Sequence, residues 1–184
     1  MALSQSALNG LLDAVRAGDG TDVLRNIEVL RFDDVDLDVE TAVATLVAGE
    51  GDADAQSRLA VHYRLGLGVG RDPVMAVTWY RKAADQGDAG AQLLLGLMYR
   101  LGEGVPQDDV EAVKLHRIAA LQGFASAQYN LGVMYANGEG VERDDVTAYV
   151  WWSIAAANGN KSANRNKPIL TKGMSPDQIA KAEA

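Results

Sequence analysis

The sequence predicts an all-α fold, a right-handed α/α solenoid of helical hairpins stacked in chain order. Two observations lead to this prediction. A stretch of 36 residues recurs three times without a gap, at residues 51–86, 87–122 and 123–158. Aromatic residues make up only 6% of the chain, whereas glycine occurs 19 times and alanine is abundant. This composition favours close contacts between helices over a sheet rich in β-branched and aromatic residues.

The first helix of each repeat is predicted from small and apolar residues at helical spacing. In the first repeat, Ala55, Leu59 and Tyr63 follow one another at intervals of four and therefore share one helical face. Gly66 and Gly68 are expected to end this helix, because glycine readily adopts the positive φ angles of a tight turn. The same residue types recur at the equivalent positions of the other two repeats.

The second helix of each repeat is predicted to begin at an aspartate. Asp72, Asp108 and Asp144 suit the N-cap position, because a short carboxylate can accept hydrogen bonds from the free N–H groups of the first turn. Pro73 follows at the first helical position, where a missing N–H is tolerated. Glu111 lies three residues after Asp108, a spacing that resembles a capping box. Each second helix ends at the glycine that opens the next block.

These repeated columns resemble the Sel-one-like repeat (SLR), a relative of the tetratricopeptide repeat. The shared pattern is A-Q-x-x-L-[AG]-x-x-Y-x-x-G-x-G-V-x-x-D-x-x-x-A, closed by A-A-x-x-G, and it covers residues 51–158. Trp79 and Trp151 match the aromatic position of the second helix, whereas Ala60 and Leu115 depart from the pattern. The resemblance implies an SLR/TPR-like superhelix, and a role as a non-enzymatic scaffold or adaptor for protein–protein interaction.

Irregular segments flank the three repeats. Residues 1–50 are predicted to form a degenerate helical N-terminal cap, with helices around Leu8 to Val15, around Val23 to Leu30 and over residues 39–48. Together with the repeats and the C-terminal segment, this cap is expected to form one solenoid domain.

Residues 159–184 are predicted to form a degenerate C-terminal cap. Ala163 keeps the repeat register, but Pro168 is expected to break the first helix of this segment. Ser175 suits the N-cap of a last helix, with Gln178 at its third position. Because the sequence stops a few residues later, we expect the natural chain to continue beyond Ala184.

Charge and composition exclude several classes of function. The net charge is −8, with −7 in residues 1–50, −4 in residues 51–158 and +3 in residues 159–184. An acidic chain is a poor partner for nucleic acid, whose phosphates require a basic face. No stretch approaches the roughly 20 apolar residues of a membrane span. The absence of cysteine excludes disulfides and thiol chemistry.

The expected compartment follows from the N-terminus. Residues 1–13 contain neither a basic residue nor a continuous apolar run, so they do not form a signal peptide. We therefore expect the cytoplasm, or the periplasm or secretion if a leader has been removed.

No catalytic residue, metal site or cofactor is expected. Alternating carboxylates between Asp34 and Glu40 invite comparison with a Ca²⁺ loop, but an EF-hand would need glycine at Val39 and glutamate at Thr45. A solvated acidic loop that caps the next helix is the favoured interpretation.

Two further patterns are weak candidates for chemistry. His62 and His116 occupy different repeat columns, and no nucleophile and base accompany them. The spacing Gly66-x-Gly68-x-Gly70 follows a predicted helix, whereas a dinucleotide fingerprint follows a strand. A chain-reversing turn is therefore predicted there.

The candidate binding surface is the face of the first helices opposite the shared stripe. Five of its nine residues are valine, leucine or tyrosine, although a solvent face should be polar. By the resemblance, this face lines a concave groove for a peptide or partner protein, and Arg64 and Arg100 could receive a carboxylate. Packing between adjacent first helices would give the same pattern, and both interpretations stay open. The nine residues are Ser57, Val61, Arg64, Leu93, Leu97, Arg100, Tyr129, Val133 and Ala136.

Two alternative functions belong to other classes. The apolar face could pair with itself in a self-associating structural module, which would make the chain a homo-oligomer. Some cysteine-rich relatives of this repeat family are linked to β-lactam binding, which suggests a hydrolase-like enzyme. The disulfide framework of those relatives is absent here.

Overall fold

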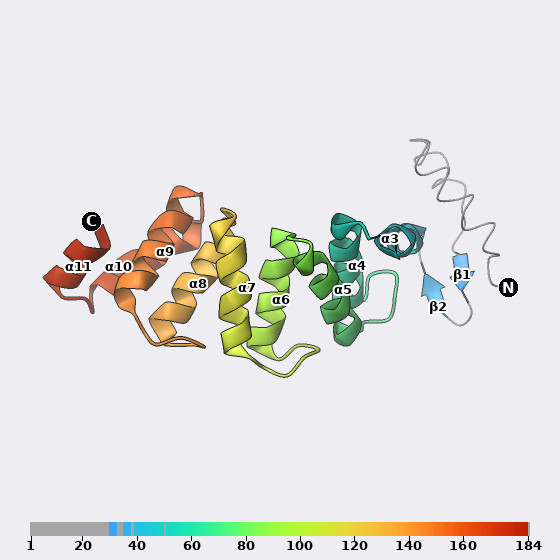
Figure 1. The fold of residues 1–184 in the computed structure, drawn as a ribbon, viewed down its shortest axis with the longest axis horizontal. Helices are drawn as coiled ribbons and strands as arrows, with labels where there is room; N and C mark the ends of the chain where they lie inside the picture. Colours follow the sequence, from blue (N-terminus) through green and yellow to red (C-terminus); the bar gives the residue numbers. More distant parts are fainter. Residues whose placement is uncertain (1–29, 33–34, 38, 50, 184) are drawn as a thin grey trace. The chain divides into compact units, whose positions relative to one another are not determined.

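The computed structural model describes residues 30–32, 35–37, 39–49 and 51–183, in which nine helices and two short strands occur (Figure 1). The chain divides into two compact units, Met1–Gln86 and Gly87–Ala184. This boundary coincides with the end of the first 36-residue block. A single solenoid domain across all 184 residues therefore remains a prediction.

The first unit contains a short β-hairpin within the segment predicted to be a helical cap. Strands β1 (Leu30–Phe32) and β2 (Val35–Leu37) pair antiparallel, with Leu30 opposite Leu37. The helical prediction is wrong for these residues. Apolar residues alternate with Arg31 and Asp36 here, and this period of two is typical of a strand. Two aspartates, a residue type common in turns, separate the strands in sequence. The helices predicted around Leu8 to Val15 and before residue 30 lie outside the described residues.

Three helices complete the described part of the first unit: α3 (Val39–Gly49), α4 (Ala53–Leu65) and α5 (Pro73–Asp85). Helix α3 confirms the helix predicted over residues 39–48. Ala48, Ala55 and Leu59 are almost fully buried and form the core between α3 and α4, with Tyr63 and Trp79 packed against them. The predicted stripe of the first helix therefore faces this core.

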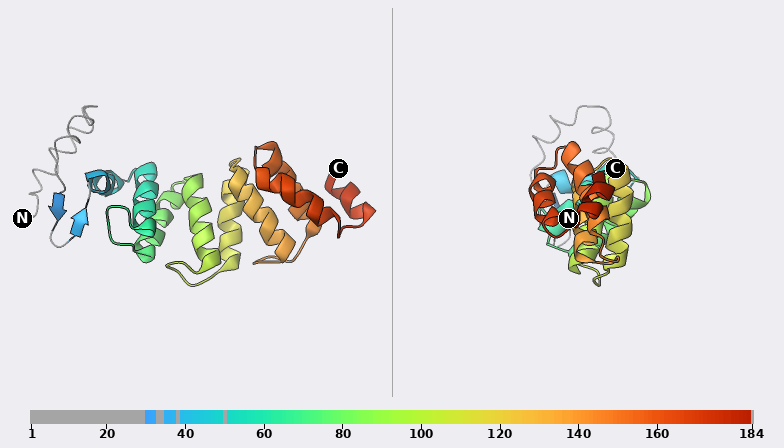
Figure 2. Two further views of the ribbon diagram at one scale, coloured as in Figure 1. Left: turned by 180° about the vertical axis from the view of Figure 1, so that it is seen from behind. Right: turned by 90° about the vertical axis from the view of Figure 1, so that its left-hand side faces the viewer.

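Six helices make up the second unit: the first five pack side by side in chain order, whereas the last packs against the fourth (Figures 1 and 2). Ala112, Ala127 and Leu131 are fully buried at the contact between the second and third of these helices. Alanine dominates this core, so the helix backbones can approach closely, as the composition predicts. The six helices are α6 (Ala89–Leu101), α7 (Asp109–Leu121), α8 (Ala125–Asn137), α9 (Asp145–Ala157), α10 (Lys161–Thr171) and α11 (Pro176–Glu183).

The aspartate caps form as predicted. The Asp72 carboxylate accepts hydrogen bonds of 3.0 Å from the backbone N–H groups of Val74 and Met75, and Asp144 caps α9 in the same way. Asp108 caps α7 through the N–H of Glu111 at 2.9 Å. The reciprocal capping-box bond is absent there, because the Asp108 N–H donates to the Tyr99 carbonyl instead.

A glutamine in each first helix ties neighbouring helix ends together. Gln56 donates from Nε2 to the carbonyl of Ala48 at 3.1 Å and accepts from Gln86 at 2.8 Å. In the second unit, Gln128 makes the equivalent bonds to Ala120 and Asn158, at 3.0 and 2.9 Å. Both glutamines are buried. The repeated A-Q pair therefore has a structural role, because each amide joins the preceding second helix to the end of its own repeat.

Glycines in the first helices of the second unit leave space for large rings of the second helices. A Cβ at Gly132 would lie 2.5 Å from Nε1 of Trp152, a distance that real contacts do not reach. A Cβ at Gly96 would lie 3.0 Å from Cε1 of His116. The first helix can therefore approach the ring of the second helix only because these side chains are missing.

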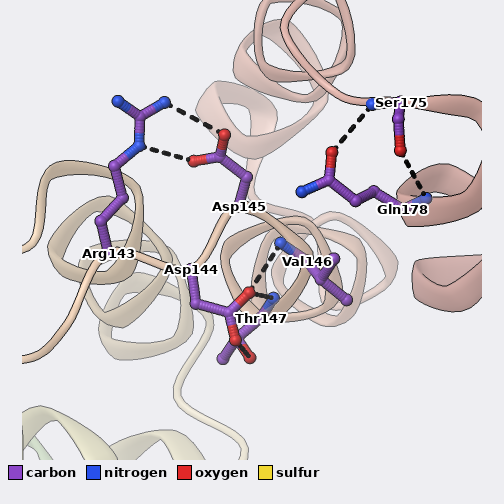
Figure 3. A network of polar contacts seen from close by, with 7 residues as sticks. All are labelled: Arg143, Asp144, Asp145, Val146, Thr147, Ser175 and Gln178. Carbon is purple, nitrogen blue, oxygen red and sulfur yellow. Dashed lines mark hydrogen bonds and ion pairs between the residues drawn. The ribbon is translucent and has the colours of Figure 1, made fainter.

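The C-terminal segment corrects one prediction and confirms another. Helix α10 continues through Pro168 and ends at Thr171, so this proline does not break the helix. The proline removes one helical hydrogen bond, and α10 ends three residues after it, two residues shorter than the first helices of the repeats. The cap of α11 forms as predicted: Gln178 N–H donates to Ser175 Oγ at 3.2 Å, and Ser175 N–H donates to Gln178 Oε1 at 2.8 Å (Figure 3).

Candidate functional site

All nine residues of the predicted binding face are half-buried in the structure. Ser57, Val61 and Arg64 lie on α4 of the first unit. The other six belong to the second unit, with three on α6 and three on α8. Each unit thus carries part of this face, and the face is neither fully exposed nor fully packed.

On α8 the predicted binding residues contact the next two helices. The Tyr129 ring stacks on Trp152 with ring centroids 6.2 Å apart, and the Trp152 Nε1–H donates to the Tyr129 carbonyl at 3.0 Å. Asn166 of α10 donates to the Tyr129 hydroxyl at 3.0 Å. Val133 and Ala136 pack against the same apolar cluster. Tyr129 and Val133 therefore make mainly internal packing contacts, with the second helix of their own repeat and with the helix that follows it.

On α6 the binding residues also have neighbours within the second unit. Leu93 packs against the core between α7 and α8. Arg100 places Nη1 3.5 Å from Oε2 of Glu139, and both side chains are about 30% exposed (29% and 31%). This ion pair neutralises the guanidinium of Arg100, which was predicted to receive a carboxylate of the ligand.

An open pocket of about 430 Å³ nevertheless remains at the end of α8. Ala136 lines it together with Trp152 of α9 and Ile169 of α10, and Asn137 and Asn166 supply amide groups. Ile169 is 66% exposed at its rim. At Ala136, the first-helix face therefore borders a cavity able to receive a side chain.

The charge in this pocket is balanced. Arg143 lines it and binds both carboxylate oxygens of Asp145, from Nε and Nη2 at 3.0 Å each (Figure 3). Asp144 next to it has a lowered pKa, chiefly because its carboxylate accepts a hydrogen bond from the Thr147 hydroxyl. The arrangement favours a neutral or apolar ligand group over a charged one.

The two histidines have structural surroundings. His62 Nδ1 lies 2.6 Å from the Thr41 hydroxyl, within the first unit. His116 is fully buried in the second unit, and neither ring nitrogen has a hydrogen-bond partner. Burial and the nearby charge of Arg100 lower the pKa of His116 to about 4, so its ring is neutral at pH 7. The Thr41 hydroxyl beside His62 also donates to the carbonyl of Leu67 at 3.2 Å, so this contact ties α3 to the turn after α4.

The remaining weak candidates also take structural roles. Gly66 and Gly68 adopt φ angles of 74° and 66° in the turn between α4 and α5, as predicted. Asp36 lies in β2 and not in the predicted acidic loop. Within the described ranges, no cluster of three or more His, Asp or Glu residues has the geometry to hold a metal ion.

A surface that the sequence reasoning missed lies on the second helices of the second unit. Val110 and Ile118 on α7 are 53% and 48% exposed, and Val150 and Ile154 on α9 are 37% and 39% exposed. Val110 and Ile118 lie eight residues apart with Lys114 midway between them, and Val150 and Ile154 lie four residues apart, so each pair shares one helical face. That spacing was visible in the sequence, and it would have indicated an apolar stripe.

Comparison with known proteins gives a family and two similar structures. The Sel1 repeat model matches residues 53–88, 89–124 and 125–160, two residues later than the blocks read from the sequence but with the same period. A protective antigen of uropathogenic Escherichia coli strains, described as displaying an SLR fold, is 33% identical with a TM-score of 0.76. The match covers 96% of this chain but 39% of the antigen.

The second similar structure is a Sel1 repeat protein from Oxalobacter formigenes. It is 38% identical with a TM-score of 0.63, and the match covers 68% of this chain and 95% of that one. The comparison with curated proteins found no match.

These matches confirm the predicted α/α solenoid class and the resemblance to SLR proteins. Proteins built from such repeats are generally scaffolds for protein interaction, and their fold is typically non-catalytic. None of the helices in the described part of the chain has the length and apolar character needed to cross a membrane. With three matched repeats over more than half of its length, the chain belongs to the Sel1 repeat family.

Proposed function

We propose that this chain is a non-enzymatic scaffold that binds a peptide or a segment of a partner protein on the first-helix face of its repeats. One observation carries the proposal: the open pocket at the end of α8, which Ala136 of the predicted face lines. Pockets of roughly 300–1,000 Å³ are typical of ligand sites. At about 430 Å³, this one is large enough for a bulky side chain.

The lining of the pocket defines the ligand group it suits. Trp152, Ile169 and Leu170 form an apolar wall, and the amides of Asn137 and Asn166 can bond to a peptide backbone. Because Asp145 already neutralises Arg143, a ligand carboxylate would gain little there. We therefore expect an apolar side chain in the pocket and peptide groups along its rim.

The other predicted binding residues differ in how far they remain accessible within their own units. Ser57, Val61 and Arg64 are half-buried on α4 and keep part of their surface accessible. Tyr129 and Arg100 contribute chiefly through internal contacts. Substitution of these two residues would therefore mix effects on binding with effects on stability, and the better probe is an exposed residue of the pocket.

The test is a selection of peptides from a random display library on the purified full chain, followed by affinity measurement on variants. Ile169→Ser removes an exposed apolar wall of the pocket, and Leu121→Ser is the matched control, because Leu121 is 75% exposed at the end of α7. One group of selected peptides should bind Ile169→Ser about tenfold more weakly and Leu121→Ser with unchanged affinity, the loss expected for a central apolar contact. A first-helix binding site would be refuted if no selected peptide lost affinity for Ile169→Ser.

A further inference from the structure

A second pocket, of about 480 Å³, lies between α7 and the loop that joins α8 to α9. Most of its residues come from the second helix of the second repeat and none of them lines the first-helix pocket, so the two pockets are separate. Val113 is buried, with 4% of its surface exposed, whereas Val110 and Ile118 are about half exposed at 53% and 48%. The pocket thus has an apolar base and two apolar walls that reach solvent.

Glycine at position 140 allows this pocket to form. Gly140 has a φ of 66°, and a Cβ there would clash with the backbone carbonyl of Asp109 and lie 2.8 Å from the Val110 nitrogen. The loop therefore runs directly against the first turn of α7, and Val141 closes one side of the cavity. A backbone held this closely gives the pocket a fixed wall.

Both charged side chains that line the pocket are cations, although the net charge of the chain is −8. Arg117 donates from Nη2 to the hydroxyl of Tyr135 at 2.6 Å, a neutral partner that leaves the guanidinium charge uncompensated. Lys114 pairs with Glu111 at 2.8 Å, yet 63% of its side chain remains exposed. An apolar cavity with a cationic rim is complementary to an apolar side chain flanked by carboxylates.

The other repeats do not combine these features. At the positions of Lys114 and Ile118, the first repeat has Thr78 and Lys82. The third repeat has two apolar residues there, Val150 and Ile154. Among the three repeats, only the second places a cation between two exposed apolar residues. The combination of an apolar cavity and a cationic rim is therefore specific to α7.

We propose that this pocket is a docking site for an acidic segment of a partner protein. One bulky apolar side chain of the segment occupies the cavity over Val113, and carboxylates on either side of it lie next to Lys114 and Arg117. The site goes beyond the proposed first-helix surface. A scaffold with both sites would hold two different segments on one unit.

Peptide selection on the full chain also tests this site, with variants chosen on α7. Ile118→Ser removes an apolar wall, and Ile154→Ser makes the same change at the equivalent exposed position of α9. The double variant Lys114→Gln with Arg117→Gln removes the cationic rim. All of these positions are exposed. Helical circular dichroism should therefore stay unchanged, which confirms that each variant folds.

The expected result is a group of selected peptides that carry acidic residues around one bulky apolar residue. These peptides should bind Ile118→Ser about tenfold more weakly, lose affinity on the double variant and in raised salt, and keep full affinity for Ile154→Ser and Ile169→Ser. The proposal is overturned if no selected peptide depends on Ile118, or if the dependent peptides are neutral or basic. Light scattering that shows an Ile118-dependent dimer would also overturn it, by assigning the pocket to a second copy.

Discussion

A buried histidine should make the second unit sensitive to mild acid. His116 is fully buried on α7, beneath Gly96 of α6, and neither ring nitrogen has a hydrogen-bond partner. Protonation would place a charge in this apolar space, next to the guanidinium of Arg100. Glu139 pairs with Arg100 at 3.5 Å and makes no hydrogen bond to the histidine. The folded state therefore favours the neutral ring.

The size and direction of the effect follow from the pKa of His116, which falls from 6.5 to about 4 on folding. Between these values the unfolded chain binds more protons than the folded one, so the free energy of unfolding decreases as the pH falls. The contribution is fully present above pH 6.5 and is lost by about pH 4. Because one pKa unit corresponds to about 1.4 kcal/mol, the total loss is about 3 kcal/mol.

The assay is urea unfolding, followed by circular dichroism, at several pH values between 7 and 4.5. His116→Phe is the matched variant, because it keeps an aromatic ring and removes the titrating group. Wild type should lose most of this contribution, about 2 kcal/mol, by pH 4.5, and the variant should show a much flatter pH dependence. Parallel loss of stability in both proteins would refute a neutral buried histidine as the cause.

Three further predictions concern contacts that hold the repeats together. Gly132→Ala should lower the free energy of unfolding by about 1–3 kcal/mol, because the added Cβ displaces the Trp152 ring. The control is Gly90→Ala, whose added Cβ meets only the flexible side chain of Asp88. Thermal unfolding should show a clear loss of stability for the first variant and little change for the control. Gln128→Leu should cost about 2 kcal/mol in urea unfolding, because two buried hydrogen bonds are lost, and an unchanged midpoint would contradict this role. Ser175→Ala should weaken the α11 cap by about 1 kcal/mol, seen as faster amide exchange in α11 with α9 unaffected.

The hairpins could be predicted from sequence because their signals are local. Asp72 caps the helix that it precedes, and Gly66 takes the positive φ angle that its turn requires. Such interactions join residues within a few positions of one another, and the 36-residue period shows each of them three times. The strands at 30–37 lie outside this period, and a single copy of Val35-Asp36-Leu37 was too short to outweigh the expectation of helices.

The binding face was harder to predict because a helix in a stack has neighbours on more than one side. The angular position of Tyr129, opposite the shared stripe, correctly placed it away from the core between α7 and α8. It did not show that Trp152 and Asn166 approach from that side. For Ala136, the same face opens into a pocket, whose other walls come from Trp152 of α9 and from Ile169 and Leu170 near the end of α10.

Variation between the repeats is by itself a poor guide to a binding surface. The most divergent aromatic column holds Tyr80, His116 and Trp152, and all three are buried. In the second unit, Gly96 lies opposite His116 and Gly132 lies opposite Trp152, and each glycine leaves room for the ring. Variation indicates recognition only where it coincides with exposure. The column of Ile118 meets both conditions, since its side chain is 48% exposed, and this coincidence favours α7 as a docking surface.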